Sequence, residues 1–330
     1  MARALLLQGP GRFSWADRPD AHAGVGEVLV RPRWTGLCGT DLHILDGLHP
    51  RARFPLALGH ELAAIVETGN LAGRVVLVDP LFACGACPSC RRGAPNVCGR
   101  GGTIGIDRDG GLGGLLAIRE ERLHPLPDQV PDHIVPLGEP LAVAIHAVRR
   151  VPSVAGATVA VLGAGPVGLL LAHVARRDGA RVLIAEVSPS RRAAAAGMGF
   201  ALLDADRPLE DCRSATGLEG ADVVFDAAGS AALGPMLTAF ARRGGTLAMV
   251  AAHAHPVAFD LADVMFRELS VVGQRAYLPT DVRAAVVMLG EDVAALSPLV
   301  TDRLTADDVP AALERLRAGE GLRTVVACPG

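Results

Sequence analysis

Apolar runs and amphipathic stretches alternate along the chain from about residue 151. The apolar runs predict buried strands at 158–165, 181–186, 221–230, 245–252 and 269–274. The stretches 166–180 and 188–200 predict helices, and further helical sequence separates the strands at 221–230 and 245–252. Continuous apolar strands with helices between them indicate a parallel sheet that helices cover on both faces.

The first 150 residues show a different pattern of short β-type runs that Gly and Pro interrupt. These runs lie at 27–34, 61–69, 73–80 and 114–127. Short strands with frequent turns predict a partly closed, β-barrel-like domain. The tail from 297 to 330 reads as a strand, an amphipathic helix and a last strand.

Composition narrows the class of protein. The chain has 330 residues, half of them hydrophobic, and a formal net charge of −3. This excludes a disordered chain and argues against nucleic acid or an anionic membrane as the main partner. Every basic residue in the count of 32 is Arg, so mechanisms that need a Lys Schiff base or a P-loop Lys are excluded.

One uncharged segment, 151–175, is long enough to span a bilayer. Its glycines and Pro166 would interrupt a spanning helix, so a buried strand, a glycine turn and a helix explain it better. The N-terminal apolar run is too short for a signal peptide. We therefore expect a soluble, cytoplasmic protein that does not contact a membrane.

Four closely spaced cysteines form a C-x2-C-x2-C-x7-C pattern, at Cys84, Cys87, Cys90 and Cys98. Clustered cysteines in a cytosolic chain are more often metal ligands than disulfides. Four soft thiolates with no open position suit a tetrahedral structural zinc. An iron–sulfur cluster and two disulfides are the alternatives.

A glycine-rich turn follows the strand at 158–165 and opens the next helix. Gly163, Gly165 and Gly168, with Pro166 and Val167 between them, form the GxGxxG pattern of a dinucleotide site. The glycines allow the tight turn, the approach of the pyrophosphate and close helix–strand packing. The helix N-terminus then offers free N–H groups to the phosphates.

Two further residues bear on which dinucleotide binds. Glu186 ends the next strand, where a carboxylate can hold both ribose hydroxyls of NAD and would repel a 2′-phosphate. Arg191 can cover the adenine or, alternatively, grip that 2′-phosphate. We predict NAD in preference to NADP.

A second metal site is predicted from Cys38, His60 and Glu139. One thiolate, one imidazole and one carboxylate with one open position match the ligand pattern of catalytic zinc. Such an ion acts as a Lewis acid on a substrate oxygen while hydride leaves the carbon.

Three residues near Cys38 can support this chemistry. Thr40 is placed to reach the substrate oxygen, and His43 can pass its proton toward solvent. Asp41 is a candidate acceptor for the ring N–H of His60.

Together these groups resemble the zinc-dependent alcohol dehydrogenase type of the medium-chain dehydrogenase/reductase superfamily. The resemblance covers essentially the whole chain. It rests on CGTD at 38–41, GHE at 59–61, the four cysteines, GEPLAVAIHA at 138–147, GAGPVG at 163–168, Glu186 and the C-terminal strand.

The resemblance implies an α/β fold made of two domains. A GroES-like β-barrel catalytic domain would comprise residues 1–150, with a structural zinc lobe at 84–98. A doubly wound, parallel-sheet Rossmann domain that binds NAD would comprise 151–290, and residues 291–330 would return to the catalytic domain. Two zinc ions per chain and a homo-oligomer, either a tetramer or a dimer, are also implied.

Within the superfamily the chain resembles the sorbitol, polyol and L-threonine dehydrogenase branch. Glu139 stands in the region where the ethanol-oxidising type has a Cys ligand. In the resembling branch Glu61 can enter the zinc shell directly or by exchange with water, and Glu139 can ligate through water. Cys38 and His60 therefore rank first as ligands of the catalytic zinc, and Glu139 and Glu61 second.

Three functions follow from these predictions. The first is an NAD-dependent zinc dehydrogenase that converts a polar secondary alcohol (a polyol, sugar, cyclitol or aminocyclitol) to the ketone. The second is L-threonine 3-dehydrogenase, for which Arg51, Arg53 and Arg275 are candidate partners of the substrate carboxylate. The third is a non-catalytic protein that binds NAD and zinc.

Overall fold

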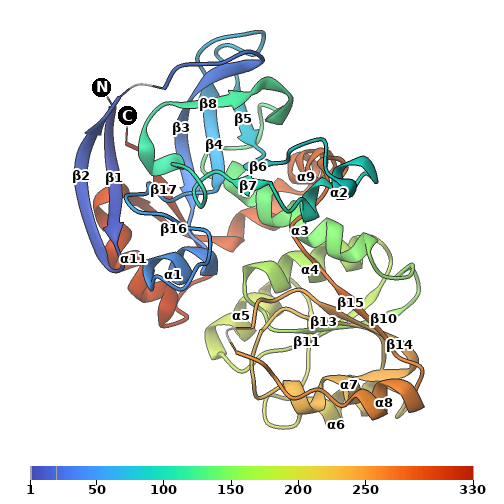
Figure 1. Ribbon diagram of the computed structural model, residues 1–330. Helices are drawn as coiled ribbons and strands as arrows, with labels where there is room; N and C mark the ends of the chain where they lie inside the picture. The colour runs from blue at the N-terminus through green and yellow to red at the C-terminus, as the bar shows by residue number, and fades with distance from the viewer. Residues whose placement is uncertain (1, 20, 254, 330) are drawn as a thin grey trace. The chain divides into compact units, whose positions relative to one another are not determined.

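The computed structural model describes residues 2–19, 21–253 and 255–329. The chain divides into two compact units (Figure 1). Unit 1 comprises Met1–Pro140 and Leu278–Gly330, and unit 2 comprises Leu141–Tyr277.

These boundaries differ from the predicted ones at 150/151 and 290/291. The first boundary falls inside the first turn of helix α3 (Gly138–Arg149), which sequence patterning treats as one element. At the second, helix α9 (Pro279–Glu291) belongs to unit 1, where Gln129 Nε2 donates to the Gly290 carbonyl at 3.4 Å. Helical periodicity alone does not show which unit a helix packs against.

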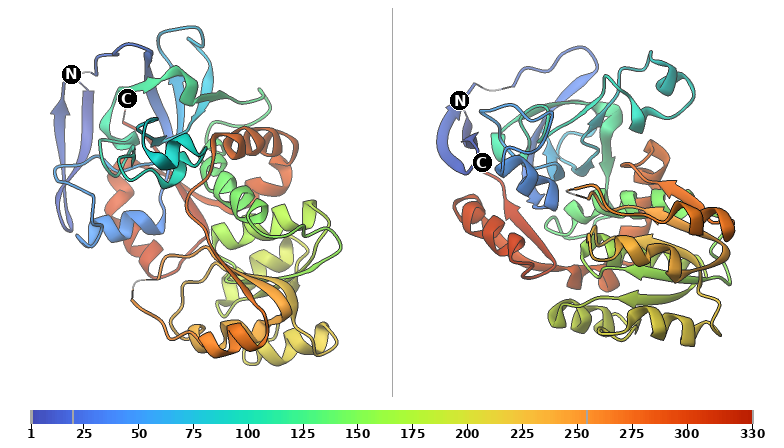
Figure 2. Two further views of the ribbon diagram at one scale, coloured as in Figure 1. Left: turned by 45° about the vertical axis from the view of Figure 1, so that its right-hand side comes forward. Right: turned by 60° about the horizontal axis from the view of Figure 1, so that its bottom comes forward.

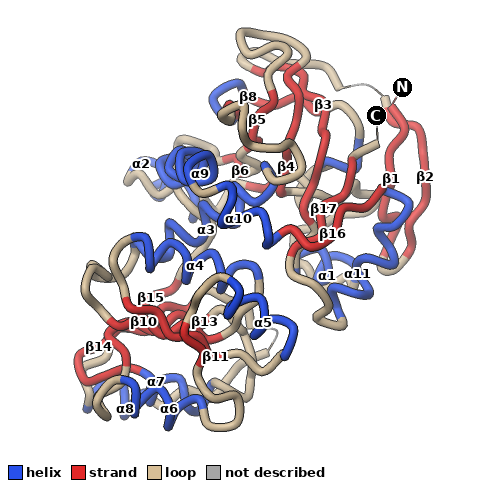
Figure 3. Tube along the Cα trace, turned by 180° about the vertical axis from the view of Figure 1, so that it is seen from behind, coloured by secondary structure: helices blue, strands red, loops and turns tan. Residues whose placement is uncertain are grey.

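Unit 2 is built on a parallel sheet in the strand order β12-β11-β10-β13-β14-β15. Counted along the unit, this is the order 3-2-1-4-5-6, which confirms the predicted doubly wound parallel sheet. Helices α4 and α5 cover one face, and α6, α7 and α8 cover the other (Figures 1 and 3). The strands of unit 2 are β10 (Thr158–Leu162), β11 (Arg181–Ala185), β12 (Ala201–Leu202), β13 (Ala221–Asp226), β14 (Ala241–Met249) and β15 (Ser270–Gly273).

The helices of unit 2 begin where the sequence favours a helix start. Proline occupies the first helical position of α4, α5 and α6, where its missing N–H costs no hydrogen bond. Their bounds are α4 (Pro166–Arg177), α5 (Pro189–Gly197), α6 (Pro208–Ala215), α7 (Leu237–Phe240) and α8 (Leu261–Phe266).

Unit 1 is built on a mostly antiparallel sheet in the order β16-β17-β3-β4-β5-β9, with β8 also paired to β3. Buried and less buried positions alternate along the first half of β3, so one face of this strand lies against the core. The C-terminal strand β17 pairs antiparallel with β3, Val325 opposite Gly36. The last, red part of the chain thus lies beside the blue N-terminal part (Figure 2).

The remaining strands of unit 1 form two small ladders, β1 with β2 and β6 with β7. The strands of unit 1 are β1 (Ala2–Gly9), β2 (Arg12–Arg18), β3 (Glu27–Gly36), β4 (Glu61–Val66), β5 (Val75–Val78), β6 (Leu81–Phe82), β7 (Gly102–Thr103), β8 (Leu116–Arg119), β9 (Leu123–Pro125), β16 (Val300–Thr305) and β17 (Arg323–Ala327). Besides α9, its helices are α1 (Gly39–Leu45), α2 (Pro88–Arg91), α10 (Val293–Leu296) and α11 (Val309–Arg317).

Each unit has its own apolar core. In unit 1 one cluster joins β1, α1 and α11, and another fills the sheet around Val30, Leu62 and Val76. In unit 2 the core lies against β10, β11, β13 and β14. Among the described residues, no helix has the length and apolar character that crossing a membrane requires.

Candidate active site and dinucleotide site

Cys38 is held at the N-terminus of α1 by backbone hydrogen bonds. Its Sγ accepts the N–H of Thr40 at 3.3 Å, and its own N–H donates to Asp41 Oδ2 at 2.9 Å. This reciprocal capping fixes the conformation at the start of the helix. The Cys38 Sγ lies 3.1 Å from Nε2 of His60.

A glycine turn brings His60 to this position. Gly59 has φ +105°, and a Cβ there would lie 2.6 Å from Thr35 Oγ1 and 3.1 Å from the Gly111 nitrogen. A larger residue would therefore be strained in conformation and would also collide with its neighbours. His60 follows this turn at the entrance to β4 and is 5% exposed.

Asp41 completes a compact group of metal-binding side chains. Single ligand atoms of Cys38, Asp41 and His60 all lie within 4.8 Å of one another. Burial would lower the pKa of His60, but Cys38 and Asp41 raise that pKa well above its ordinary value. Asp41 Oδ1 and His60 Nδ1 lie 3.6 Å apart, and both are buried without a hydrogen-bond partner among the described residues.

This donor set fits a zinc ion. A thiol and an imidazole nitrogen face each other, and a carboxylate lies behind the other ring nitrogen. A carboxylate in that place orients a metal-binding imidazole and raises its basicity. The arrangement supports the predicted roles of Cys38, His60 and Asp41.

Glu61 is engaged elsewhere. Its Oε1 accepts from Arg323 Nη1 at 2.7 Å, and both side chains are almost fully buried, with 1% and 3% exposure. Burial raises the pKa of Glu61, and the Arg323 guanidinium opposes that rise. Glu61 therefore lies in an ion pair and outside the Cys38–Asp41–His60 group.

Sequence reasoning did not identify Arg323. It lies 262 residues after Glu61, and nothing in the local pattern of β17 distinguishes it from a surface arginine. Only the return of the C-terminal strand to unit 1 brings the two charges together.

Three other predicted residues do not belong to this group of metal-binding side chains. Glu139 occupies the first turn of α3 and is not among the residues that the structure gathers at Cys38. Thr40 and His43 both lie on α1, three residues apart, so they share one side of the helix. The roles of these three residues remain predictions.

The four cysteines of the second motif converge on one point. Their Sγ atoms lie 3.4 to 3.9 Å apart in the pairs Cys84–Cys90, Cys84–Cys98, Cys87–Cys90 and Cys87–Cys98. Tetrahedral zinc with Zn–S bonds of about 2.3 Å separates its sulfurs by about 3.8 Å. A disulfide needs S–S of about 2.05 Å, so the described cysteines are free thiols and the disulfide alternative is wrong.

The local backbone favours a thiolate at one of these cysteines. The Ala86 N–H lowers the pKa of Cys84 to about 6. Burial and the neighbouring thiols raise the pKa of Cys90 to about 11. Four closely packed thiols do not all ionise readily, because their negative charges would repel one another. A divalent cation between them would stabilise the thiolates.

The glycine-rich turn of unit 2 has the geometry of a dinucleotide site. Gly165 is the N-cap of α4, and Pro166 and Val167 begin the helix. A Cβ on Gly168 would lie 2.0 Å from the Gly163 carbonyl oxygen, so only glycine allows the helix to approach the strand this closely. The free N–H groups at the start of α4 lie at the carboxyl edge of the sheet, where parallel α/β sheets bind ligands.

Glu186 and Arg191 adjoin this turn. One carboxylate oxygen of Glu186 accepts the Ala164 N–H at 2.7 Å, and the other accepts those of Val187 and Ser188. The Arg191 guanidinium approaches Gly165, and its Nε is buried without a hydrogen-bond partner among the described residues. The structure thus brings together the residues predicted to bind the cofactor.

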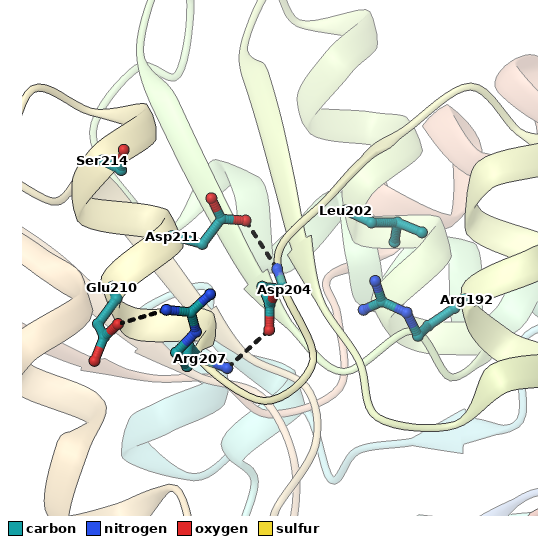
Figure 4. A pocket seen from close by; sticks show the side chains of 7 residues that line it. All are labelled: Arg192, Leu202, Asp204, Arg207, Glu210, Asp211 and Ser214. Carbon is teal, nitrogen blue, oxygen red and sulfur yellow. Dashed lines mark hydrogen bonds and ion pairs between the residues drawn. The ribbon is translucent and has the colours of Figure 1, made fainter.

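A cavity of about 500 Å³ in unit 2 lies apart from this turn, between the end of β12 and α6 (Figure 4). Its charged groups already serve the structure. Asp211 accepts the Asp204 N–H at 2.8 Å, Asp204 accepts the Arg207 N–H, and Arg207 approaches Glu210 at 3.7 Å. Arg192 donates to the carbonyls of Glu186 and Leu203, so it braces the strand that carries Glu186.

Fold and site together define a protein that joins a unit with two metal-binding groups to a dinucleotide-binding unit. The alcohol dehydrogenase GroES-like domain matches residues 24–128, and the zinc-binding dehydrogenase domain matches residues 166–291. The chain belongs to this family of zinc-binding alcohol dehydrogenases, enzymes that act on CH–OH groups. The predicted family and fold class are confirmed.

The curated relatives match over nearly their whole length. The 2-dehydro-3-deoxy-L-galactonate 5-dehydrogenase of Pseudoalteromonas atlantica is 33% identical, over 92% of each chain. The sorbitol dehydrogenase of Halalkalibacterium halodurans is 31% identical over 96% of each. The L-threonine 3-dehydrogenase of Rhizobium rhizogenes is 30% identical over 99% of this chain and 98% of the relative.

A solved structure of similar fold carries a cofactor. The zinc-binding dehydrogenase of Sinorhizobium meliloti, whose crystal structure has NADP bound, superposes with a TM-score of 0.91. It is 30% identical, and the match covers 99% of both chains.

Proposed function

We propose that this protein is an NAD-dependent zinc dehydrogenase that converts a polyol, sugar or related polar secondary alcohol to the ketone. The observation that carries the proposal is the Cys38–His60 pair, with Asp41 behind the imidazole, in a chain whose other unit carries Glu186 at the glycine-rich turn. The similarity to dehydrogenases named for sorbitol and for a sugar acid supports this substrate class.

Each residue then has a defined task. Cys38 and His60 would hold the catalytic zinc, with Glu139 and Glu61 as further candidates, and Asp41 orients the His60 ring. Zinc supplies Lewis acidity that stabilises the negative charge on the substrate oxygen. Thr40 accepts a hydrogen bond from the substrate hydroxyl, and His43 passes the released proton toward solvent.

The direct test is NADH formation by the zinc-loaded protein against a panel. The panel contains sorbitol and other polyols, sugar acids, inositols, aminocyclitols and L-threonine, with simple alcohols as controls. We expect turnover on a substrate with hydroxyls on both sides of the reacting carbon. Turnover on simple alcohols alone would contradict the proposed substrate class.

L-Threonine 3-dehydrogenase is the second candidate, because relatives of that name match almost the whole chain. The structure gives this candidate less support. Arg51 is paired with Asp107 at 3.2 Å, and Arg53 Nη1 donates to the carbonyls of Pro50 and Ala52. Two of the three candidate arginines are therefore already engaged, Arg51 with Asp107 and Arg53 with carbonyls of its own loop.

Glu186 decides the preference for NAD over NADP in this proposal. We expect Glu186→Ala to weaken NADH binding by about 1–3 kcal/mol, because hydrogen bonds between a carboxylate and ribose hydroxyls are lost. NADPH binding should weaken less, since the carboxylate no longer repels its 2′-phosphate. Calorimetric titration of both cofactors measures the difference.

Glu210→Ala is a matched control, because Glu210 is an exposed carboxylate of unit 2 that forms an ion pair with Arg207 near the cavity of Figure 4. It should leave both affinities unchanged. An unchanged NADH affinity in Glu186→Ala would remove Glu186 from the cofactor site. Tighter binding of NADPH than NADH by the wild type would assign the 2′-phosphate to Arg191.

We also propose two zinc ions per chain, one structural and one catalytic. Cys90→Ser should reduce the zinc content from two to one and lower the thermal midpoint by roughly 2–4 °C for each kcal/mol lost. Elemental analysis and calorimetry measure both effects. Iron and inorganic sulfide in anaerobically purified protein would favour a cluster, and a wild type with only one zinc would favour the non-catalytic protein.

A homo-oligomer is the last part of the proposal. Strand β15 lies at the edge of the unit 2 sheet with Val271 exposed, and nearby α8 exposes Leu261, Met265 and Phe266. An apolar sheet edge of this kind is typical of a surface that another chain covers. Light scattering after size-exclusion chromatography should give a dimer or tetramer, and a monomer would contradict this part.

A further inference from the structure

A buried acid–histidine pair lies in unit 2, outside the groups that the proposed mechanism uses. Asp226 ends strand β13 and is 1% exposed. Its Oδ2 lies 2.7 Å from Nε2 of His253, whose side chain is 15% exposed. Burying a carboxylate is costly unless it is paired and hydrogen-bonded, so such a pair needs an explanation.

Asp226 binds two loops at once. Its Oδ1 accepts the N–H groups of Ala228 and Gly229, both at 3.1 Å. Its backbone carbonyl accepts those of Val250 and Ala251, at 3.1 and 2.9 Å. The His253 bond is a third connection, and it fixes the loop that follows β14 to the end of β13.

The first of these loops is in contact with the glycine-rich turn. A Cβ on Gly163 would lie 3.0 Å from the Ala228 nitrogen and Cα. On its other side, a Cβ on Gly229 would lie 3.1 Å from Ala251 Cβ and from the Ala252 oxygen. The glycine-rich turn, residues 228–229 and residues 251–252 thus form one continuous surface at the carboxyl edge of the sheet.

The strand order tells which half of a dinucleotide this surface would meet. In a 3-2-1-4-5-6 sheet the pyrophosphate lies at the turn after strand 1, and the ribose acid ends strand 2. Here those are the Gly163 turn and Glu186, so the adenosine half lies on the side of β10, β11 and β12. Asp226 lies at the end of strand 4 (β13), and His253 follows strand 5 (β14), on the opposite side of the turn. We therefore expect these two residues on the side of the nicotinamide half.

We propose that the Asp226–His253 pair positions the loop that receives the nicotinamide ring of the cofactor. It holds the 250–253 loop against residues 228–229, so that the surface beyond β13 and β14 is formed before the ring arrives. A loop that is already ordered binds its ligand more tightly, because binding then carries no entropic cost of ordering the loop. The inference rests on the proposed function, since it requires a dinucleotide in unit 2.

Two ligands separate this role from a general structural one. NADH and ADP-ribose share the adenosine, the pyrophosphate and the second ribose, and only NADH carries the nicotinamide. His253→Leu removes the N–H that Asp226 accepts, and we expect it to weaken NADH binding by about tenfold or more. ADP-ribose affinity should change by less than about twofold, because ADP-ribose lacks the nicotinamide ring that this loop is proposed to position.

His253→Gln keeps an N–H donor near the position of Nε2 and should restore most of the NADH affinity. Asp226→Asn should show the same separation of the two ligands as His253→Leu, which covers the case in which that variant does not fold. Calorimetric or fluorescence titration gives each affinity without any turnover.

Three results are decisive. Equal loss of NADH and ADP-ribose binding would make the pair a general structural contact and overturn the inference. Unchanged NADH binding in both His253→Leu and Asp226→Asn would also overturn it. A wild type that binds neither ligand would instead refute the proposed dinucleotide site, which separates failure of the proposed function from failure of this inference.

Discussion

Replacing Cys38 by serine is expected to lower kcat by about a thousandfold or more, the order of losing several kcal/mol of Lewis-acid stabilisation. NADH affinity should stay near the wild-type value. The thiol lies 3.1 Å from His60 Nε2 in unit 1, and the residues predicted to bind the dinucleotide lie in unit 2. A hydroxyl is a much poorer ligand for zinc than a thiolate, so the zinc content should fall by one ion per chain.

Cys328→Ser is the matched control for this experiment. Cys328 belongs to the same unit, but it lies outside both metal-binding groups, and burial raises its pKa far above the ordinary value. It should retain both zinc ions and nearly full activity. If Cys38→Ser kept wild-type kcat, Cys38 and His60 would not be the ligands of the catalytic metal.

Much of unit 2 could be predicted from the sequence, because its signals are local. Buried parallel strands read as continuous apolar runs, and β10, β11, β13 and β15 all lie within the predicted ranges. Strand β14 overlaps its predicted range of 245–252 but begins at Ala241. Within the glycine-rich turn, Gly163 and Gly168 are needed for steric reasons that a single short motif records. The same holds for the four cysteines, whose convergence follows from their short spacing.

The ion pairs could not be predicted, because their partners meet only in the folded chain. Glu61 and Arg323 are 262 residues apart, and Asp226 ends β13 while His253 lies in the loop after β14. For Glu61 the family resemblance implied a place in the zinc shell, but a resemblance does not show where a carboxylate points. The structure pairs one carboxylate oxygen of Glu61 with a guanidinium, and it places Asp41 beside Cys38 and His60. The place of Glu61 in the zinc shell stays a prediction.

The second large effect is expected from Arg323→Met. This change leaves Glu61 buried without its counter-charge and removes a 2.9 Å hydrogen bond to the Leu37 carbonyl, next to Cys38. Breaking a buried pair by removing one partner typically costs about 3–5 kcal/mol. Denaturant titration can follow unit 1 alone, because both tryptophans, Trp15 and Trp34, belong to it.

Two further variants test whether the unpaired charge of Glu61 causes the stability loss expected in Arg323→Met. Arg317→Met removes an ion pair with Asp46 of similar length, 2.6 Å, but both side chains are partly exposed, so the loss should be about 1 kcal/mol or less. In the double variant Glu61→Gln with Arg323→Met, a neutral amide replaces the stranded carboxylate. Because the desolvated charge is gone, this variant should be more stable than Arg323→Met alone. The stability loss of the double variant could instead equal the sum of the losses in Glu61→Gln and Arg323→Met alone. That result would show that Arg323 stabilises unit 1 through packing and the Leu37 carbonyl, and that its charge contributes little.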